Sequence, residues 1–358
     1  MDTVFNQANV DPLQQPLFLG EPLGVQRYDI IKYPVFKETD DMQQEFYWRP
    51  QEVELKKDRA DFKTLTENEK FIFTANLKYQ TMLDSVICRG VSTLLPYVTN
   101  TELEATLIEW QRFEKVHSQS YSYIIQNVYS SPQEMFDSIY DDEEIQARAK
   151  SAIFDYDRLM GMAESKNLTE EELRRQIYLT IMSINVLEGI RFYVSFVCSF
   201  VFGENKKMVG NAEIIKLIKR DEEVHLYNTQ QLIKILRTEE SEGFVEIAKE
   251  CDALAGQMFD SAAEEEKRWA KYLFKDGSLI GLNENIMIQY IDWLVSTRKK
   301  AVGLPHDKGL KNPVAGWSDA WMNSDAVQNA PQENENTTYK IGASTNDVDD
   351  MDFGDLEL

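Results

Sequence analysis

The sequence EKVH occupies positions 114–117, and a second copy of the same pattern, EEVH, occupies positions 222–225. The chain has only three histidines, and two of them end these motifs. Residues three apart on an α-helix lie on one face, so each motif directs a carboxylate and an imidazole to the same point. Oxygen and nitrogen ligands together suit iron or manganese. Two such motifs on inward-facing helices are typical of a two-metal carboxylate site inside a helix bundle.

Both motifs lie on stripes of apolar residues that recur every three or four positions, the spacing of a helix with one buried face. Two further acids, Asp84 and Glu188, lie on similar stripes of two other predicted helices. A buried carboxylate is costly unless it is paired or bound to a metal. Four helices are therefore expected to direct ligands inward, and the predicted metal ligands are Asp84, Glu114, His117, Glu188, Glu222 and His225.

The charge of this set favours metal binding over a network of ion pairs. Its four carboxylates, when ionised, carry the charge that two divalent cations would neutralise in an apolar core. Single members could have other roles: Asp84 could cap a helix or bind a lysine, and Glu188 could pair with Arg191. The two histidines could be hydrogen-bonded core residues. Each alternative explains one residue, whereas a dinuclear metal site explains all six.

Tyr121 lies one helical turn after His117 on the same stripe, so its ring is expected beside the metals. A buried tyrosine is usually a core residue. Beside two oxidisable metals it could instead lose an electron and its proton and become a radical. The side chains of Phe192, Phe196 and Ile218 would then form an apolar pocket that keeps water and reductants away from the radical.

The rest of the sequence predicts an all-α protein with long helices. Capping boxes begin predicted helices at Thr66, Thr101 and Thr169, and a proline-capped helix follows Ser131. The long helices are expected at 66–88, 101–129, 169–202, 208–237, 242–273 and 284–301. The predicted organisation is an irregular N-terminal arm at 1–65, the helical bundle with the dimetal site at 66–302, a C-terminal extension at 303–330 and a flexible acidic tail at 331–358.

The net charge of −23 at pH 7 argues against nucleic acid or an anionic membrane as a partner, because both need basic surface. Three cysteines without a C-x-x-C pair fit a reducing compartment, so we expect the cytoplasm, or the host cytoplasm for a viral protein. The amino end lacks the pattern of a secretory signal. The most apolar stretch, at 190–202, is too short to span a bilayer and predicts a buried core helix.

Acidic residues dominate the end of the chain. Between 331 and 358 the only basic residue is Lys340, and apolar residues are few, which is typical of disorder. The final segment, MDFGDLEL at 351–358, nevertheless alternates acids with apolar side chains. This segment could be a peptide that becomes ordered when it docks on a partner, or it could belong to an inert, solvating tail.

Several stretches resemble the small, radical-generating (beta) subunit of class I ribonucleotide reductase, most like class Ia, and the likeness covers nearly the whole chain. An aspartate at the first ligand position and a tyrosine one turn beyond the histidine favour this family over other ferritin-like proteins. The resemblance implies a ferritin-like helical bundle. The stretches that carry it are FYWRP at 46–50, NLKYQTMLDS at 76–85, EKVHSQSY at 114–121, NVLEGIRFYVSF at 185–196 and RDEEVH at 220–225.

The resemblance also implies roles for individual residues. The six predicted ligands match the ligands of two iron ions, with manganese as the alternative metal. Tyr121 matches the tyrosine that carries the stable radical. Trp48 and Asp221 match residues that relay an electron and a proton together with the first histidine ligand. Tyr339 matches the tyrosine that passes the radical to the large (alpha) subunit, and Glu333 matches a tail glutamate important in that relay.

In this family the radical is formed with molecular oxygen and then generates a cysteine thiyl radical in the large subunit. That thiyl radical starts the reduction of ribonucleotides to deoxyribonucleotides. The resemblance therefore implies the small subunit of ribonucleoside-diphosphate reductase, active only with the large subunit. It also implies a homodimer and docking on the large subunit through the last residues of the tail.

Two other functions compete with this one on the residues alone. A di-iron oxygenase or desaturase would need an open apolar substrate pocket beside the metals, and it would make no use of the tail. A ferritin-like iron-storage protein would need assembly into a cage and no oxidisable tyrosine at the metals.

Overall fold

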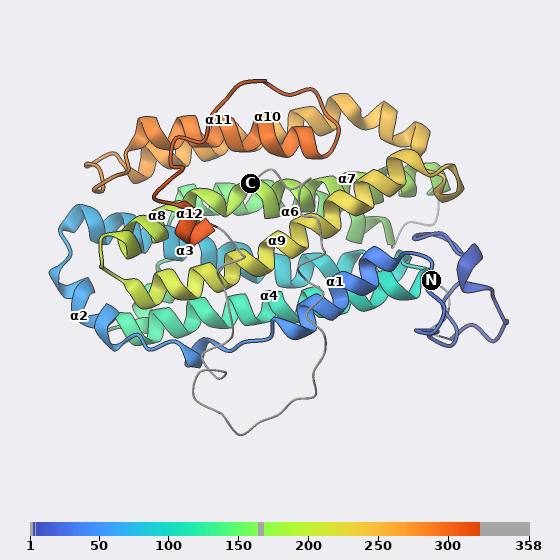
Figure 1. Cartoon of the computed structure of the whole chain (residues 1–358), viewed down its shortest axis with the longest axis horizontal. Coiled ribbons are helices and arrows are strands. Elements are labelled where there is room, and N and C mark those ends of the chain that lie inside the picture. The colour runs from blue at the N-terminus through green and yellow to red at the C-terminus, as the bar shows by residue number, and fades with distance from the viewer. Residues whose placement is uncertain (1–2, 4, 164–167, 323–358) are drawn as a thin grey trace.

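Long helices make up most of the structure, a computed structural model that describes residues 3, 5–163 and 168–322 (Figure 1). The only β pairings among these residues are two isolated bridges, Phe18 with Val98 and Leu279 with Leu282. The prediction of an all-α protein with long helices is confirmed.

Five helices form the centre of the molecule. α3 (Glu67–Gly90) packs against α4 (Thr101–Val128), and α8 (Tyr193–Glu204) packs against α9 (Val209–Thr238). α7 (Glu170–Val186) lies against α9. Most of the predicted ligands belong to these helices.

Three further helices cover this group. α6 (Glu143–Ala163) packs against α3 and α7. α10 (Val245–Leu273) and α11 (Glu284–Ala301) pack against each other, and α10 also contacts α7. The pair formed by α10 and α11 lies along the side of the molecule opposite α4 (Figure 1).

Shorter elements complete the described chain. α1 (Pro34–Glu45) packs on α4, and α2 (Lys56–Thr64) packs on α4 and α9. α5 (Pro132–Asp137) follows α4, and α12 (Asp319–Met322) packs on α9. Single turns of 3₁₀ helix occur at Pro12–Gln14, Pro50–Glu52, Val91–Thr93, Leu95–Tyr97 and Glu240–Glu242.

Two of the predicted capping boxes form as expected, and the third does not. At the start of α3, the Thr66 hydroxyl accepts from the backbone N–H of Glu69, and the Glu69 carboxylate accepts from the backbone N–H of Thr66. The same exchange begins α7 after Thr169. α4 is capped one residue earlier than predicted, because the side chain of Asn100 accepts from the N–H of Leu103.

The predicted helix at 169–202 is not continuous. α7 ends at Val186, a π-helical segment occupies Leu187–Arg191, and α8 begins at Tyr193. The whole stretch Glu170–Glu204 has the length and hydropathy of a membrane-crossing helix, but its apolar window is 100% buried inside the molecule, as in the core helix of a globular protein. The π segment matters for the site because π turns are rare and are often found where a helix carries functional residues.

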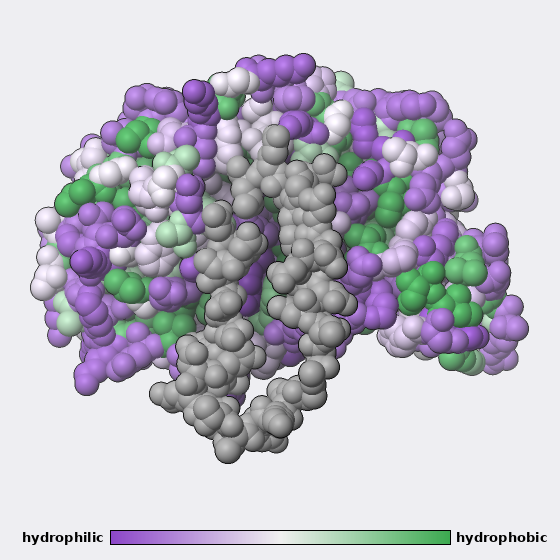
Figure 2. All heavy atoms as spheres, in the orientation of Figure 1, coloured by the Kyte–Doolittle hydropathy of each residue, from purple (hydrophilic) through white to green (hydrophobic). Residues whose placement is uncertain are grey.

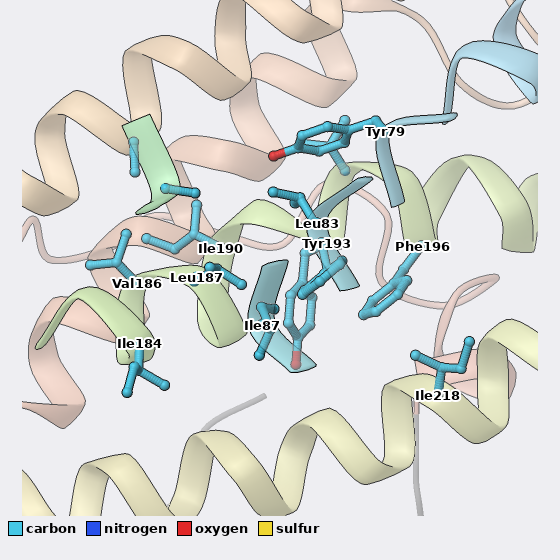
Figure 3. Close-up of a cluster of buried hydrophobic side chains, with 14 of the residues drawn as sticks. Tyr79, Leu83, Ile87, Ile184, Val186, Leu187, Ile190, Tyr193, Phe196 and Ile218 are labelled. Carbon is cyan, nitrogen blue, oxygen red and sulfur yellow. The ribbon is translucent and has the colours of Figure 1, made fainter. Parts of the chain in front are cut away.

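The apolar core is continuous through the bundle, and Figure 3 shows the part beside the π segment. Side chains from α3, such as Leu83 and Ile87, lie next to Ile190 and Tyr193 of the π segment and α8. Each of these four residues is buried. Close packing of this kind holds the ligand-bearing helices in fixed positions.

The last described element, α12, is fastened to α8. The Trp321 ring stacks on Phe200 with ring centroids 5.7 Å apart, and its indole N–H donates to Glu204 over 3.1 Å. An added Cβ at Gly203 would lie 2.8 Å from the Trp321 ring, so the absence of a side chain there allows the contact. Hydrophilic residues cover much of the face shown in Figure 2, and apolar residues form separate patches between them.

Candidate metal centre

The six predicted ligands meet in the middle of the bundle. Asp84 comes from α3, Glu114 and His117 from α4, Glu188 from the π segment, and Glu222 and His225 from α9. All six are 0% exposed. The alternative pairing of Glu188 with Arg191 does not occur, because the Arg191 guanidinium binds Glu265 at 2.6 Å.

Their donor atoms form two overlapping groups, and within each group the atoms lie within 4.8 Å of one another. One group combines Asp84 and His117 with Glu114 and Glu222. The other combines Glu188 and His225 with the same two glutamates. Because Glu114 and Glu222 belong to both groups, the geometry suits two neighbouring metal ions that share two carboxylates.

Unsatisfied polar atoms provide an independent test of this fit. Both carboxylate oxygens of Asp84 and of Glu188 are buried without a hydrogen-bond partner in the described structure. The same is true of Nδ1 of His117 and Oε1 of Glu222, although these two atoms lie only 3.1 Å apart. Buried polar groups are normally hydrogen-bonded, so such a cluster of exceptions needs a cause. Metal ions at the centre of the cluster would satisfy these atoms, and the donor set therefore fits a dinuclear metal site.

The electrostatics of the cluster also fit a dinuclear metal site. Burial and then the neighbouring carboxylates of Glu222 and Glu114 raise the pKa of Asp84 and of Glu188 well above the usual value. Burial would lower the pKa of His117, but the charge of Glu222 and the hydrogen bond to Asp221 raise it well above the usual value. Without metal, the cluster therefore retains protons to limit its negative charge. Divalent cations can replace those protons.

Trp110 is a member of the site that the sequence analysis did not single out. Its indole N–H donates to Oε1 of Glu114 over 2.8 Å, and its ring stacks on His225 with centroids 4.7 Å apart. It therefore orients two ligands from different helices. Its position four residues before Glu114 on the same stripe is the only sequence signal for this contact.

Tyr121 lies in the same buried region and is 0% exposed. Its hydroxyl has no hydrogen-bond partner in the described structure. Burial, and then the negative charges of Asp84 and Glu222, raise the pKa of Tyr121 well above its usual value. The rings of Phe192 and Phe196 stack with centroids 5.7 Å apart.

The residues predicted to form the apolar pocket around the radical are buried in the core. Phe192, Phe196 and Ile218 are each 0% exposed. Figure 3 shows Phe196 of α8 on the side of this core that also holds Ile218 of α9.

Trp48 and Asp221 are joined to His117 by hydrogen bonds. The Trp48 indole N–H donates to Oδ2 of Asp221 over 2.7 Å, and the same oxygen lies 3.2 Å from Nε2 of His117. The Arg220 guanidinium donates to the other oxygen, Oδ1, over 2.9 and 3.0 Å. Asp221 thus fixes the ring of His117 so that Nδ1 faces the carboxylates, as outer groups commonly do at metal sites.

The other predicted site residues lie outside the described part of the chain. Tyr339, Glu333 and the docking segment at 351–358 all fall after Met322, the last described residue.

A pocket of about 390 Å³ opens on the surface beside the residues that flank Trp48 in the chain. Tyr47, Arg49 and Gln51 line one side of it, and polar residues of α4 such as Ser118 and Gln119 line the other. None of the six predicted ligands lines this pocket. It therefore does not provide the apolar substrate pocket beside the metals that an oxygenase or desaturase would need.

An all-α bundle in which two Glu-x-x-His motifs and two more carboxylates converge in the core defines a class, the ferritin-like proteins with a dinuclear metal–carboxylate site. Comparisons with known proteins identify the family within that class. The family model for the small chain of ribonucleotide reductase matches residues 27–307, and the chain belongs to this family. It is the small subunit of a ribonucleoside-diphosphate reductase, an oxidoreductase, and neither alternative function is favoured.

Individual relatives agree with this family. Ribonucleoside-diphosphate reductase 1 subunit beta of Salmonella typhimurium is 42% identical over 373 residues, which cover 99% of each chain. The ribonucleoside-diphosphate reductase subunit beta of Enterobacteria phage T4 is 40% identical over 98% of this chain and 97% of its own. The R2 subunit of ribonucleotide reductase from Clostridium botulinum has a similar solved structure, with a TM-score of 0.81 and 27% identity over 90% of this chain and 98% of that one. Members of the family bind a dinuclear metal site and act with a large subunit.

Proposed function

We propose that the six clustered side chains hold two iron ions and that Tyr121 carries a stable tyrosyl radical. The position of Tyr121 is the observation that carries this proposal. Its buried phenol lies one turn beyond His117, and the charge of Asp84 is close enough to raise its pKa. When bound, the iron ions supply a one-electron oxidation of this phenol with molecular oxygen as the oxidant.

The three residues of the predicted apolar pocket are proposed to preserve the oxidised phenol. Phe192, Phe196 and Ile218 offer only hydrocarbon surface and are fully buried, so they exclude water and soluble reductants. A stable radical needs this kind of isolation. The polar neighbour of the phenol is the carboxyl group of Asp84, whose charge helps to raise the pKa of Tyr121.

Trp48, Asp221 and His117 provide the route by which the radical leaves the centre. The shared Oδ2 of Asp221 connects the indole N–H of Trp48 to the imidazole of His117. Trp48 is buried, whereas the adjacent Tyr47 and Arg49 are exposed, so the route ends close to the protein surface. We assign the next steps, outside the described residues, to Tyr339 and Glu333.

Aerobic loading of the metal-free chain with Fe(II) tests this function. We expect two iron ions per chain and an organic-radical signal in electron paramagnetic resonance. Loading with Mn(II) under the same conditions should fill the site without that signal. Two bound irons without a radical would contradict the role of Tyr121, and failure to bind two metals would contradict the site itself.

We further propose that the chain forms a homodimer in the cytoplasm, or in the host cytoplasm for a viral protein, and docks on the large subunit through residues 351–358. Its family acts with a large subunit and includes known dimers. The alternation of acids with Phe353, Leu356 and Leu358 supports docking, since an inert tail needs no apolar side chains. The net charge of −23 supports the absence of nucleic acid and anionic membrane among the partners.

Deletion of residues 351–358 is expected to abolish activity with the large subunit while radical formation continues. The reason is that the segment lies more than a hundred positions after His225, the last predicted metal ligand, and is proposed to contact the large subunit. Binding to the large subunit, radical yield and turnover should be measured on the same preparation. A variant that replaces only Asp352 and Asp355 with asparagine tests whether charge or apolar contact dominates. Full activity after the deletion would exclude the docking role.

Trp48→Phe is expected to leave two metals and the radical intact but to abolish turnover with the large subunit. Phenylalanine fills most of the space but loses the indole N–H that binds Asp221, and it is much harder to oxidise. Trp293→Phe, a partly buried tryptophan on α11, serves as the control and should remain active. Wild-type turnover by Trp48→Phe would remove this residue from the relay.

A further inference from the structure

Glu188 differs from the other predicted ligands because it lies on a π segment, Leu187–Arg191, and not on a regular helix. A change of helical register disturbs the regular backbone hydrogen bonds, and the affected groups need other partners. One such partner comes from α11. Nε of Arg298 donates to the backbone carbonyl of Gly189, the residue after Glu188, over 3.2 Å.

Arg298 is built into the core for this contact. It is 3% exposed, and its guanidinium lies over the ring of Tyr193, 5.0 Å from the centroid. Burying a guanidinium is costly unless it is paired or hydrogen-bonded, so the burial of Arg298 indicates a structural role. α11 carries none of the predicted ligands, yet it packs against the π segment and brings this guanidinium to Gly189, the residue after Glu188.

The glycine in the π segment permits the approach. A Cβ built on Gly189 would lie 3.0 Å from Cδ1 of Leu226 on α9 and 3.3 Å from Cδ of Arg298. A larger residue would fit only if the side chains of Leu226 and Arg298 shifted by a few tenths of an ångström. Gly189 and Arg298 are therefore matched to each other.

The C-terminal end of the π segment, Arg191, is held by contacts of its own. Arg191 binds Glu265 of α10 at 2.6 Å and donates to the hydroxyl of Ser151 on α6 over 3.1 Å. The segment is thus fastened at two points, Gly189 and Arg191, which both follow Glu188 in the chain, and the carboxylate oxygens of Glu188 have no hydrogen-bond partner in the described structure. These contacts fix the backbone next to Glu188 and thereby help to set where its carboxylate points.

We propose that Arg298 is a positioning residue for the metal centre: by holding the Gly189 carbonyl, it keeps the π segment in the form that directs Glu188 toward Glu222 and Glu114. This proposal rests on the proposed metal-binding function. Loss of Arg298 should have a local effect. It should weaken the metal site that Glu188 shares with His225 and not the site of Asp84 and His117.

Two measurements test the role of Arg298. The first is amide hydrogen exchange of the metal-free protein, which is independent of metal binding. In Arg298→Met, exchange at 187–193 should accelerate about tenfold or more, while α3 and α4 stay protected. Gly189→Ala crowds Arg298 from the other side without removing a charge. It should accelerate hydrogen exchange at the same amides.

The second measurement is anaerobic titration with Fe(II), followed by near-infrared circular dichroism, which reports on the ligand geometry of each ion. In Arg298→Met, one of the two sites should bind about 10–100-fold more weakly and its bands should shift. Arg298→Lys should lie between wild type and Arg298→Met. Lys299→Met is the control, since Lys299 is the next residue on α11 and pairs with Asp260 on the surface at 2.6 Å.

The outcomes separate the possibilities. Unchanged exchange and unchanged spectra in Arg298→Met would overturn the proposal. Equally faster amide exchange in α3, α4 and the π segment would also overturn it, because Arg298 would then stabilise the whole core and not the π segment in particular. Failure of the wild-type protein to bind two ions would contradict the proposed metal centre, whereas the exchange measurement would still decide whether Arg298 holds the π segment.

Discussion

Tyr121→Phe is expected to abolish the organic-radical signal of aerobically iron-loaded protein while two metal ions remain bound per chain. The substitution removes only the phenol oxygen, and that oxygen has no hydrogen-bond partner in the described structure. Little stability is therefore lost, and the metal ligands keep their positions. The expected loss is complete, because phenylalanine is far harder to oxidise than tyrosine.

Electron paramagnetic resonance, metal analysis and turnover with the large subunit should be measured together. Tyr156→Phe is a demanding control. Tyr156 is also buried, its hydroxyl also lacks a partner, and the charges of Glu188 and Glu114 help to raise its pKa. This control should keep the radical and the activity. A signal that survives in Tyr121→Phe, or disappears in Tyr156→Phe, would assign the radical to another residue.

Glu222→Ala is expected to reduce metal binding more than removal of any ligand that serves a single site. Glu222 belongs to both groups of donor atoms, so its loss affects both ions. It also lies 3.1 Å from Nδ1 of His117 and 2.9 Å from Nδ1 of His225. We expect fewer than one tightly bound metal ion per chain and no radical.

Two comparisons make the result of Glu222→Ala specific. Asp84→Ala removes a ligand of one group only and should retain more metal. Glu266→Gln is the control for a buried glutamate, because Glu266 is 0% exposed but pairs with Arg148, outside the ligand cluster. Metal content should be measured after loading at equal Fe(II) and removal of loosely bound ions. Two ions retained by Glu222→Ala would exclude it as a ligand.

Much of this architecture could be predicted because it depends on local rules. Thr66 and Thr169 begin their helices through capping boxes that involve neighbouring residues only. The Glu-x-x-His spacing places Glu114 beside His117 on any helix, whatever surrounds it. The buried acids could be recognised because each interrupts an apolar stripe. These signals need no knowledge of distant contacts.

The π segment could not be predicted in this way. Every residue from Gln176 to Gly203 is buried except Ser183. This stretch therefore has no exposed polar residues whose spacing could show where the α-helix changes to a π-helix. The roles of Trp110 and Arg298 were missed for a related reason. Both depend on contacts between helices, and the partners of Arg298 lie more than a hundred positions away in the chain.

The stacking of Trp321 on Phe200 has a consequence for how the subunits meet. It fixes the point from which the chain continues after Met322, and the 28 residues at 323–350 could span at most about 95 Å before the proposed docking segment. When residues 351–358 dock on the large subunit as proposed, the connection would raise the local concentration for further contacts between the two subunits to roughly the millimolar range. Weak contacts near Trp48 would then be enough to align the two proteins for each turnover, and they could release between turnovers without the partners drifting apart.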